Sequence, residues 1–335
     1  MPGVLPQDNI VYTTRLGCQC VGDSRALVSD FRDDSIDLIM TSPPFALLRK
    51  KSYGNKDQDV YVEWLADFGR EALPKLRETG SFVLDLGGAY KKGRPVRSLY
   101  NYRVLVYFVD ILGYRLAEEF FWFNPAKLPS PIEWVNKRKI RVKDAVNTVW
   151  WFSKSDFPKA DVKRVLKPYS DRMRQLIEDP DSFYSPKKRP SGHDVAESFA
   201  RQNRGAIPPN LLEIANTASN SHYMRVTKDL GRRRHPARFP EQLPRFFIEF
   251  LTEPGDLVVD LFAGSNTTGY VAEMLGRRWV AIEKRLDYAA LSAVRFMEGC
   301  STTRIANVVR QIEDGKPVDI SAANPQQQLF EPHMR

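Results

Sequence analysis

The sequence has little cysteine and no long apolar run. Its three cysteines (Cys18, Cys20 and Cys300) form no C-x-x-C pair and lie near no histidine pattern. Such an odd, unpaired set argues against a disulfide framework and a zinc site, so we expect no metal. No stretch approaches the roughly 20 apolar residues of a membrane span, and the N-terminal segment lacks the apolar run of a signal peptide. These absences predict a cytoplasmic protein without a membrane partner.

The net charge of +9 is distributed unevenly along an otherwise ordinary globular composition. The segment from Lys137 to Arg234 contains 22 Lys and Arg and 11 Asp and Glu, a net charge of 22 − 11 = +11. The rest of the chain therefore carries a net charge of 9 − 11 = −2. Positive charge gathered in one segment suits contacts with the phosphates of nucleic acid. A solvated basic face is the alternative interpretation of the same segment.

Strand-like and helix-like segments alternate over most of the chain. Apolar runs typical of strands lie at 36–40, 81–88, 120–123, 146–152, 256–260 and 279–282. Helical spacing of apolar residues is found at 61–76, 104–112 and 241–251. Between about 153 and 234 the pattern gives way to Pro, Ser, Asn and basic residues. The alternation predicts a doubly wound α/β sheet with an inserted, loop-rich region.

A nucleoside-binding pattern occurs near the C-terminal end of the chain. The strand that ends at Asp260 is followed by the turn L-F-A-G-S-N-T-T-G (261–269), and the next strand ends at Glu283, which suits ribose hydroxyls. The middle glycine of the G-x-G-x-x-G dinucleotide motif is absent, which disfavours a nicotinamide dehydrogenase. S-adenosylmethionine has no phosphate and needs only one tight turn at Gly264, although a purely structural turn would look the same.

The tetrapeptide Ser42-Pro43-Pro44-Phe45 ends the first apolar strand. Two successive prolines cannot continue a sheet ladder, so these residues must form a loop at the carboxyl end of that strand. A base amino nitrogen is a poor nucleophile because its lone pair is delocalised into the ring. Acceptors on its protons, such as Ser42 Oγ and the Pro43 carbonyl, would favour the reactive form, while Phe45 would stack on an extruded base.

Four segments together resemble one family. Ser-Pro-Pro-Phe (42–45), D-L-F-A-G-S-N-T-T-G (260–269), Gly-Asp-Ser (22–24) and His-Pro-Ala-Arg-Phe-Pro (235–240) resemble the permuted β group of DNA amino-methyltransferases. The segments TSPPFALLRKKSYGN (41–55) and IPPNLLEIANT (207–217) resemble one cytosine-N4 member in particular. The resemblance spans about residues 14–296 and implies a Rossmann-like methyltransferase sheet with circularly permuted motif order and an inserted DNA-recognition region.

The resemblance also implies domain limits and residue roles. The limits are an N-terminal arm (1–13), a catalytic part (14–152), a target-recognition region (153–234), a cofactor-binding part (235–313) and a mobile tail (314–335). Asp23 is expected to bind the adenine of S-adenosylmethionine, and Glu283 its ribose. The methionine moiety is expected among Phe262, Gly264, Ser265, Asn266 and Thr267, with Phe239 packing nearby and Asp260 ordering the turn. The target base is expected to bind to Ser42, Pro43, Pro44 and Phe45, with help from Trp150 or Trp151 unless these are plain buried strand residues.

The DNA contacts that we expect are gathered mainly in the basic middle region. They are Lys50, Lys51, Arg201, Asn203, Arg204, Asn216, Asn220, His222 and Arg225. The predicted activity is methylation of cytosine N4 of a flipped base in double-stranded DNA, within a restriction-modification system whose endonuclease acts separately.

Several alternatives stay open at this point. Adenine-N6 methylation is the main one, although adenine-N6 family members more often carry Asp or Asn where this chain has Ser42. An RNA amino-methyltransferase is disfavoured because no RNA-binding module is recognisable. Carbon-5 methylation of cytosine is disfavoured because no cysteine follows a proline to act as nucleophile. A DNA-binding protein that has lost catalysis is the alternative from another class, and intact Ser42, Gly264 and Glu283 argue against it.

Overall fold

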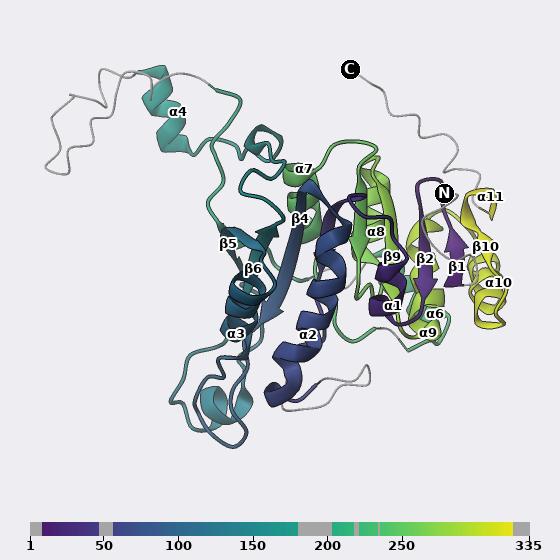
Figure 1. The fold of residues 1–335 in the computed structure, drawn as a ribbon, viewed down its shortest axis with the longest axis horizontal. Coiled ribbons are helices and arrows are strands. Elements are labelled where there is room, and N and C mark those ends of the chain that lie inside the picture. Colours follow the sequence, from purple (N-terminus) through teal and green to yellow (C-terminus); the bar gives the residue numbers. More distant parts are fainter. Residues whose placement is uncertain (1–8, 47–55, 180–202, 218–220, 234, 324–335) are drawn as a thin grey trace, which may run out of the picture. The chain divides into compact units, whose positions relative to one another are not determined.

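The computed structural model describes residues 9–46, 56–179, 203–217, 221–233 and 235–323 (Figure 1). Four of the predicted DNA contacts lie outside these described residues: Lys50, Lys51, Arg201 and Asn220. The chain divides into two compact units, residues 1–159 with 210–335, and residues 160–209. The first unit contains the sheet and the cavity described below.

The described part of the first unit forms a ten-stranded sheet in the order β10-β1-β2-β9-β8-β3-β4-β6-β5-β7. The strands are β1 (Ile10–Thr13), β2 (Gly17–Val21), β3 (Ile36–Thr41), β4 (Leu76–Gly87), β5 (Arg115–Phe123), β6 (Val146–Ser153), β7 (Leu211–Glu213), β8 (Leu257–Asp260), β9 (Arg278–Glu283) and β10 (Val318–Asp319). Strands β2, β9, β8, β3 and β4 are parallel, and β6 is antiparallel to both β4 and β5. The carboxyl ends of five neighbouring strands therefore meet at one edge.

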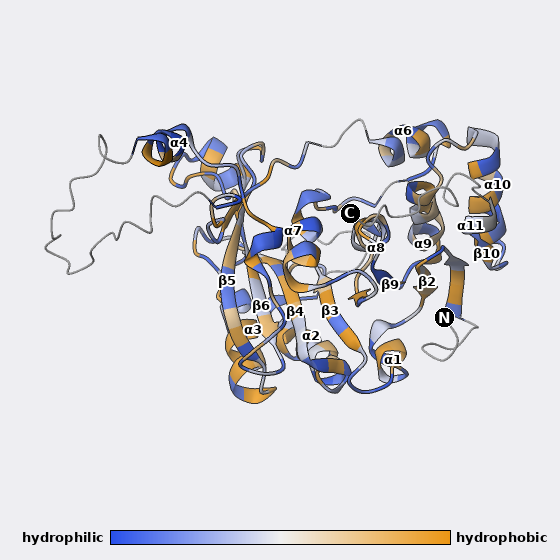
Figure 2. Ribbon diagram, turned by 90° about the horizontal axis from the view of Figure 1, so that it is seen from above, coloured by the Kyte–Doolittle hydropathy of each residue, from blue (hydrophilic) through white to orange (hydrophobic). Residues whose placement is uncertain are grey.

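Helices cover both faces of this sheet. They are α1 (Ser24–Ser29), α2 (Gln58–Ala72), α3 (Tyr100–Val106), α6 (His222–Asp229), α7 (Gln242–Leu251), α8 (Thr267–Met274), α9 (Leu286–Ser292), α10 (Thr302–Glu313) and α11 (Ile320–Ala323), with short turns η2 (Leu73–Lys75), η3 (Tyr107–Ile111), η4 (Glu133–Lys137) and η7 (Ala293–Phe296). Figure 2 shows α1, α2 and α3 on one side of the strands and α7, α8 and α9 on the other. The predicted doubly wound α/β sheet is confirmed. No described helix is both long and apolar enough to cross a membrane.

Local sequence explains the central elements. Every residue of β3, I-D-L-I-M-T, is buried, as expected of a strand covered on both faces, and Pro43-Pro44 ends it. In α2, Tyr61, Leu65, Phe68 and Ala72 recur at helical spacing and are buried in the core shared with α1 and α3.

The sheet is assembled from both ends of the chain. Strand β3, from the first part of the sequence, lies between β4 and β8, and β8 comes from the last third. Likewise β2 pairs with β9 over Gly17–Val21 (Figure 1). The loop that follows β3 and the turn that follows β8 thus lie at the same edge, although the catalytic motif comes first in the sequence and the cofactor motif last.

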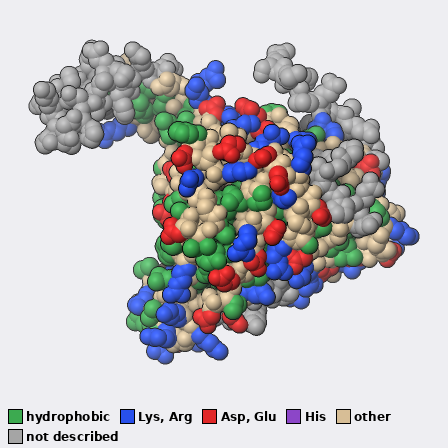
Figure 3. Space-filling model, in the orientation of Figure 1, with side chains coloured by type: hydrophobic (Ala, Val, Ile, Leu, Met, Phe, Trp, Pro, Cys, Tyr) green, Lys and Arg blue, Asp and Glu red, His purple; other side chains and the backbone are tan. Residues whose placement is uncertain are grey.

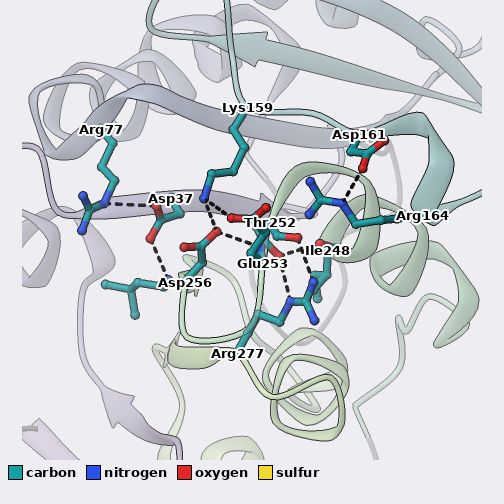
Figure 4. A network of polar contacts seen from close by, with 11 residues as sticks. Asp37, Arg77, Lys159, Asp161, Arg164, Ile248, Thr252, Glu253, Asp256 and Arg277 are labelled. Atoms are coloured by element: carbon teal, nitrogen blue, oxygen red, sulfur yellow. Dashed lines mark hydrogen bonds and ion pairs between the residues drawn. The ribbon is translucent and has the colours of Figure 1, made fainter. Parts of the chain in front are cut away.

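A polar network fixes the opposite, amino ends of β3 and β8 (Figure 4). Asp37 accepts a hydrogen bond of 2.8 Å from the Leu257 backbone N–H and pairs with Arg77 at 3.1 Å. Lys159 pairs with Asp256 at 2.8 Å. The Asp37 contact ties the start of β8 to β3 at the edge of the sheet opposite the cavity.

The second unit, residues 160–209, is small and loop-rich where it is described. It contains η5 (Val162–Arg164) and α4 (Asp171–Glu178), which Ser170 caps by accepting from the Met173 N–H. Lys167 and Ala206 form an isolated antiparallel bridge. The predicted DNA contacts Asn203 and Arg204 lie in this unit, and the Asn203 backbone N–H donates to the Tyr169 hydroxyl at 3.0 Å.

Some segments that the sequence marked as irregular are ordered. Within the predicted recognition region, Leu211–Glu213 forms β7 beside β5, and α6 begins after its cap Ser221. Within the predicted tail, Val318–Asp319 pairs with β1, and Ile320 is fully buried. Strands of two or three residues are too short to produce a recognisable period, so their pairing depends on neighbouring strands. The predicted domain limits themselves stay predictions.

Candidate active site

A cavity of about 920 Å³ lies at the carboxyl edge of the parallel strands. Its wall is built from segments that directly follow these strands: 22–25 after β2, 42–45 after β3, 261–265 after β8 and 283–285 at the end of β9. Ligands of open α/β sheets bind at this edge. The catalytic and cofactor motifs predicted from the sequence therefore line one cavity.

Gly264 and Glu283 form the centre of the cofactor half. Gly264 has φ +54°, and a Cβ there would stand 3.0 Å from the His235 ring, so a side chain would be strained by the backbone conformation and crowded by the ring. The Gly264 N–H donates to Glu283 Oε2 at 2.8 Å, and the Arg285 N–H donates to Oε1 at 3.0 Å. Burial raises the pKa of Glu283, and the two backbone donors oppose that rise. Each carboxylate oxygen keeps a lone pair for a ribose hydroxyl.

Asp260 lies behind the turn and orders it. Its Oδ1 accepts from the Phe262 N–H at 3.0 Å and from Thr41 Oγ1 at 2.7 Å, while its Oδ2 accepts from Thr268 Oγ1 at 2.6 Å. The side chain is buried, and burial raises its pKa against these three donors.

The structure places Asn266 differently from the other residues of its motif. Its side chain is fully buried, accepts from the Gly269 N–H at 2.9 Å and donates to the Tyr12 hydroxyl at 3.1 Å. Asn266 has φ +52°, a conformation that Asn tolerates, and it is the N-cap of α8. It shapes the turn from behind, while Gly264 and Ser265 line the cavity.

Arg295 is a residue of this site that the sequence did not point to. It is 8% exposed, and Nε donates to the Ser265 carbonyl at 2.6 Å while Nη2 donates to Ser265 Oγ at 3.2 Å and to Thr267 Oγ1 at 3.0 Å. It also pairs with Glu241 at 3.2 Å and lies 4.7 Å from the centre of the Tyr223 ring. Arg295 therefore holds the cofactor turn in place from inside the protein.

The remaining predicted cofactor residues also line the cavity. Asp23 caps α1, and its carboxylate is engaged by Arg25 at 2.7 Å, which lowers the pKa of Asp23. Phe262 packs against Phe68 with ring centres 4.7 Å apart. Phe239 lies on the wall as well.

The catalytic half is organised by Asp85, which lies in β4 one strand away from Ser42. Ser42 Oγ donates to Asp85 Oδ2 at 3.0 Å, and Asn147 Nδ2 donates to Asp85 Oδ1 at 3.1 Å. Burial raises the pKa of Asp85 to about 6, although both donors and the nearby charge of Lys127 act to lower it. All four residues line the cavity.

Phe45 lies against Gly87 at the end of β4. A Cβ on Gly87 would come within 2.4 Å of the Phe45 ring, so the absence of a side chain there makes room for this aromatic residue. Behind it, the Tyr61 hydroxyl donates to the Pro44 carbonyl at 2.8 Å. Among the described residues, no donor is recorded for the Pro43 carbonyl. The loop is thus fixed by its neighbours while Ser42, Pro43, Pro44 and Phe45 face the cavity.

The two tryptophans suggested as helpers do not line the cavity. Trp150 is fully buried beside Phe152, and Trp151 donates to Ser81 Oγ at 2.8 Å on the other face of the sheet. Trp122 of β5 lines the cavity instead and donates to the Ile214 carbonyl at 2.9 Å.

His235, from the His-Pro-Ala-Arg-Phe-Pro segment, covers the cofactor turn. Its ring meets Tyr288 edge to face at 4.7 Å, and Nδ1 is hydrogen bonded to the Ala237 carbonyl. Burial lowers the pKa of His235 to about 4, so the ring is neutral near pH 7. A neutral ring adds no charge beside Arg285 and Arg238, which also line this part of the cavity.

The described DNA-contact candidates are found in three places. Asn216 lines the cavity and donates to the Arg238 carbonyl at 2.8 Å, while Asn203 and Arg204 belong to the second unit. His222 and Arg225 lie on α6, which packs on η7, and burial lowers the pKa of His222. In the described part of the chain, no group of three or more His, Cys, Asp and Glu could hold a metal ion.

Sequence reasoning missed Asp85, Asn147 and Arg295. A signal existed for Asp85, since an acidic residue within the apolar run S-F-V-L-D-L-G-G is costly to bury and marks functional sites. No comparable signal exists for Arg295, which lies 30 positions beyond Ser265 in a helical segment.

The fold and this two-part cavity define a methyltransferase, and the comparison with family models agrees. A DNA methylase family model matches residues 36–294, and the chain belongs to this family. The chain is 57% identical over 312 residues to the type II methyltransferase M.PvuII of Proteus hauseri, covering 93% of each chain. The solved PvuII DNA methyltransferase (cytosine-N4-specific) superposes with a TM-score of 0.77 at 49% identity, covering 93% of this chain and 98% of that one.

More distant relatives match as well. M.BglI of Bacillus subtilis, also a type II methyltransferase, is 28% identical over 81% of this chain and 83% of its own. The family resemblance predicted from the motifs is confirmed, and so is the likeness of the chain to the PvuII methyltransferase.

Proposed function

We propose that this protein is an S-adenosylmethionine-dependent DNA methyltransferase that methylates N4 of a flipped-out cytosine. The observation that carries the proposal is the 3.0 Å hydrogen bond from Ser42 to Asp85, beside a nucleoside-type turn in the same cavity. Because the Ser42 hydroxyl donates its hydrogen to Asp85, the lone pairs of Ser42 Oγ are available to a base amino group.

The residues of the cofactor half fit S-adenosylmethionine. Glu283 offers carboxylate oxygens for ribose hydroxyls, the bare Gly264 backbone allows close approach, and Phe262 gives an apolar surface. Asp23 lies where it can exchange part of its contact with Arg25 for the adenine amino group. When bound, this cofactor supplies a methyl group on a positively charged sulfur. No charged His235 opposes that positive charge near pH 7, since burial keeps the His235 pKa at about 4.

The catalytic half activates the amino nitrogen and removes its proton. Ser42 Oγ accepts one N4 hydrogen, and the Pro43 carbonyl accepts the other, which concentrates the lone pair on nitrogen. S-adenosylmethionine held by the Gly264 turn and Glu283 would supply the methyl group to N4 and keep the electron pair of the broken carbon–sulfur bond, which leaves a neutral thioether. Ser42 receives the N4 proton and passes its own proton to Asp85 Oδ2, so the charge lost on sulfur is balanced at the buried carboxylate.

The target base must leave the duplex to reach this position. Phe45 provides a stacking surface beside Ser42, and Gly87 allows the ring to lie there. Stacking and the two acceptors together orient the amino group toward the cofactor half of the cavity.

Recognition of the DNA sequence is assigned to residues 153–234. Its candidates for base and phosphate contacts are Arg201, Asn203, Arg204, Asn216, Asn220, His222 and Arg225, and Lys50 and Lys51, which follow the catalytic loop in the sequence, are further candidates. Asn216 supports this assignment because it lines the cavity that receives the base.

Similarity to the PvuII methyltransferase, described as cytosine-N4-specific, favours cytosine over adenine, as does Ser42. M.PvuII and M.BglI are type II methyltransferases. We extend this to a role in the prokaryotic cytoplasm beside a separate restriction endonuclease of the same specificity.

Mass spectrometry of nucleosides from treated DNA tests the proposed function. Unmethylated DNA is incubated with the protein and S-adenosylmethionine, digested to nucleosides and analysed. We expect N4-methylcytosine. N6-methyladenine would show that the scaffold acts on adenine, 5-methylcytosine would contradict the amino mechanism, and the absence of any methylated nucleoside would contradict enzymatic function.

A further inference from the structure

Two loops beside the active-site cavity carry a net positive charge almost as large as that of the whole protein. They are residues 88–99, which join β4 to α3, and residues 124–145, which join β5 to β6; together we call them the basic arm. The basic arm contains ten Lys and Arg against two acidic residues, a surplus of eight where the whole chain has nine. Figure 3 shows Lys and Arg side chains gathered at the lower left, where Figure 1 draws the loops next to α3.

The two loops are joined into one structure. Arg97 of the first loop pairs with Asp144 of the second at 2.5 Å, and Arg141 Nη2 donates to the Pro95 carbonyl at 2.9 Å. Within the second loop, Lys143 donates to the Pro125 carbonyl at 3.0 Å. The basic arm therefore presents its charges from a defined scaffold.

Most of these charges have no recorded carboxylate partner in the part of the chain that the structure describes. Asp144 pairs with Arg97, and Glu133 pairs with Arg138 at 3.0 Å and with Lys137 at 3.4 Å. Among the described residues, no ion pair is recorded for the other seven: Lys91, Lys92, Arg94, Lys127, Lys139, Arg141 and Lys143. A surface kept soluble by charge normally intersperses both signs, so this imbalance indicates an anionic partner.

The basic arm begins at the cavity itself. Asn124, Lys127 and Ala145 line the cavity together with Ser42 and Phe45. A nucleotide whose base enters that cavity must bring its flanking phosphates to the cavity mouth, next to the basic arm. The arm thus lies where the sugar–phosphate backbone of an extruded base has to pass.

We propose that the basic arm grips the phosphates that flank the target nucleotide, as a second DNA-binding surface in addition to the predicted recognition region 153–234. This inference rests on the proposed function. Phosphate contacts position the duplex without reading its sequence, so the basic arm should contribute to affinity for any DNA.

The test compares three variants, each lacking three exposed charges. Two change the basic arm: Lys91→Gln with Lys92→Gln and Arg94→Gln, and Lys139→Gln with Arg141→Gln and Lys143→Gln. The matched control is Arg304→Gln with Arg310→Gln and Lys316→Gln, on and just after α10, which contacts β10 at the far end of the sheet. Binding to a labelled random-sequence duplex is measured by fluorescence anisotropy over a series of salt concentrations.

Each phosphate contact contributes about 0.9 to the slope of log affinity against log salt. For each arm variant we expect the magnitude of this slope to fall by about two to three and the binding at low salt to weaken at least about tenfold. The control variant should keep the wild-type slope. S-adenosylmethionine affinity and the single-turnover rate at saturating DNA should stay within about twofold of wild type, since none of the six replaced side chains lines the cavity.

The outcomes separate this inference from the proposed function. Arm variants that keep the wild-type slope and affinity, while the wild type methylates DNA, overturn the role of the basic arm alone. Equal losses in the control variant also overturn it, because the effect would then follow net charge. Absence of methylated nucleosides with the wild type overturns the proposed function and the role of the basic arm with it.

Discussion

Thr41 donates a hydrogen bond of 2.7 Å from Oγ1 to Oδ1 of Asp260, across 219 positions of sequence. Thr41 is the last residue of β3 and precedes Ser42, while Asp260 is the last residue of β8 and precedes the cofactor turn. The bond therefore ties the catalytic loop to the cofactor turn directly. In the proposed mechanism, this contact and the register of the two strands would help to set the distance between a bound methyl donor and the target amino group.

Ser42→Ala should lower the rate of methyl transfer by about one to three orders of magnitude, because the acceptor for the amino hydrogen is lost. Cofactor affinity should hardly change, since Ser42 lies in the other half of the cavity. Single-turnover kinetics and titration calorimetry measure the two quantities separately. A parallel collapse of S-adenosylmethionine affinity would instead place Ser42 among the cofactor ligands.

Glu283→Ala should weaken the binding of S-adenosylmethionine by about 1 to 3 kcal/mol, the contribution of one or two hydrogen bonds to a charged acceptor. The change also leaves the Gly264 N–H without its present partner. Calorimetry on the DNA-free protein gives the dissociation constant. Glu283→Gln keeps an acceptor and should lose less, and an unchanged constant in both variants would remove Glu283 from the site.

Arg295→Met should weaken cofactor binding at least tenfold, because the Ser265 carbonyl and the hydroxyls of Ser265 and Thr267 lose their shared donor. Arg295 contacts this turn and is not among the described residues that line the cavity, so its effect on the cofactor is expected to be indirect. Arg295→Lys keeps the charge but not the forked geometry, so it should restore stability more than affinity. Melting temperature and calorimetry on both variants check this, and a loss of melting temperature with normal affinity would reduce Arg295 to a structural role.

Phe45→Ala should lose much of its activity on paired DNA and less on a substrate whose target base is mismatched. Unpairing costs a few kcal/mol, which a mismatch has already supplied, so stacking on Phe45 matters less there. The fluorescence of 2-aminopurine at the target position reports extrusion directly. No rise on binding, with equal affinity for paired and mismatched targets, would contradict base flipping.

The sequence predicted the architecture well because its signals are local. Buried strands such as 36–41 are mostly apolar, and Pro43-Pro44, Gly264 and Asn266 mark turns whose chemistry is readable in a few residues. The two motifs could be assigned to one edge of the sheet because parallel strands share that edge.

The parts that the sequence did not reveal depend on tertiary contacts. Asp85 becomes a partner of Ser42 only because β4 pairs with β3 in a register that brings Leu84 beside Thr41. Asn266 belongs to the motif of the cofactor turn, but its side chain points into the protein because it caps α8. Trp150 and Trp151 are adjacent in sequence yet point to opposite faces of the sheet, whereas Trp122 on the next strand reaches the cavity.

The pH dependence of methyl transfer tests the central claim, that Ser42 and Asp85 together take the amino proton. Burial raises the pKa of Asp85 to about 6. The carboxylate must be ionised to receive a proton, so activity should be low below pH 6 and rise as pH increases through that value. The same raised pKa lowers the free energy of unfolding above pH 6, because ionisation of Asp85 is less favourable in the folded protein than in the unfolded chain.

The measurement is the single-turnover rate at saturating DNA and cofactor from pH 5 to 8, for wild type and for Asp85→Asn. The account predicts a wild-type rate that increases with pH around an apparent pKa near 6. It predicts for Asp85→Asn a rate lower by about two orders of magnitude without that dependence. A variant that keeps the wild-type rate and the same pH profile would contradict the account.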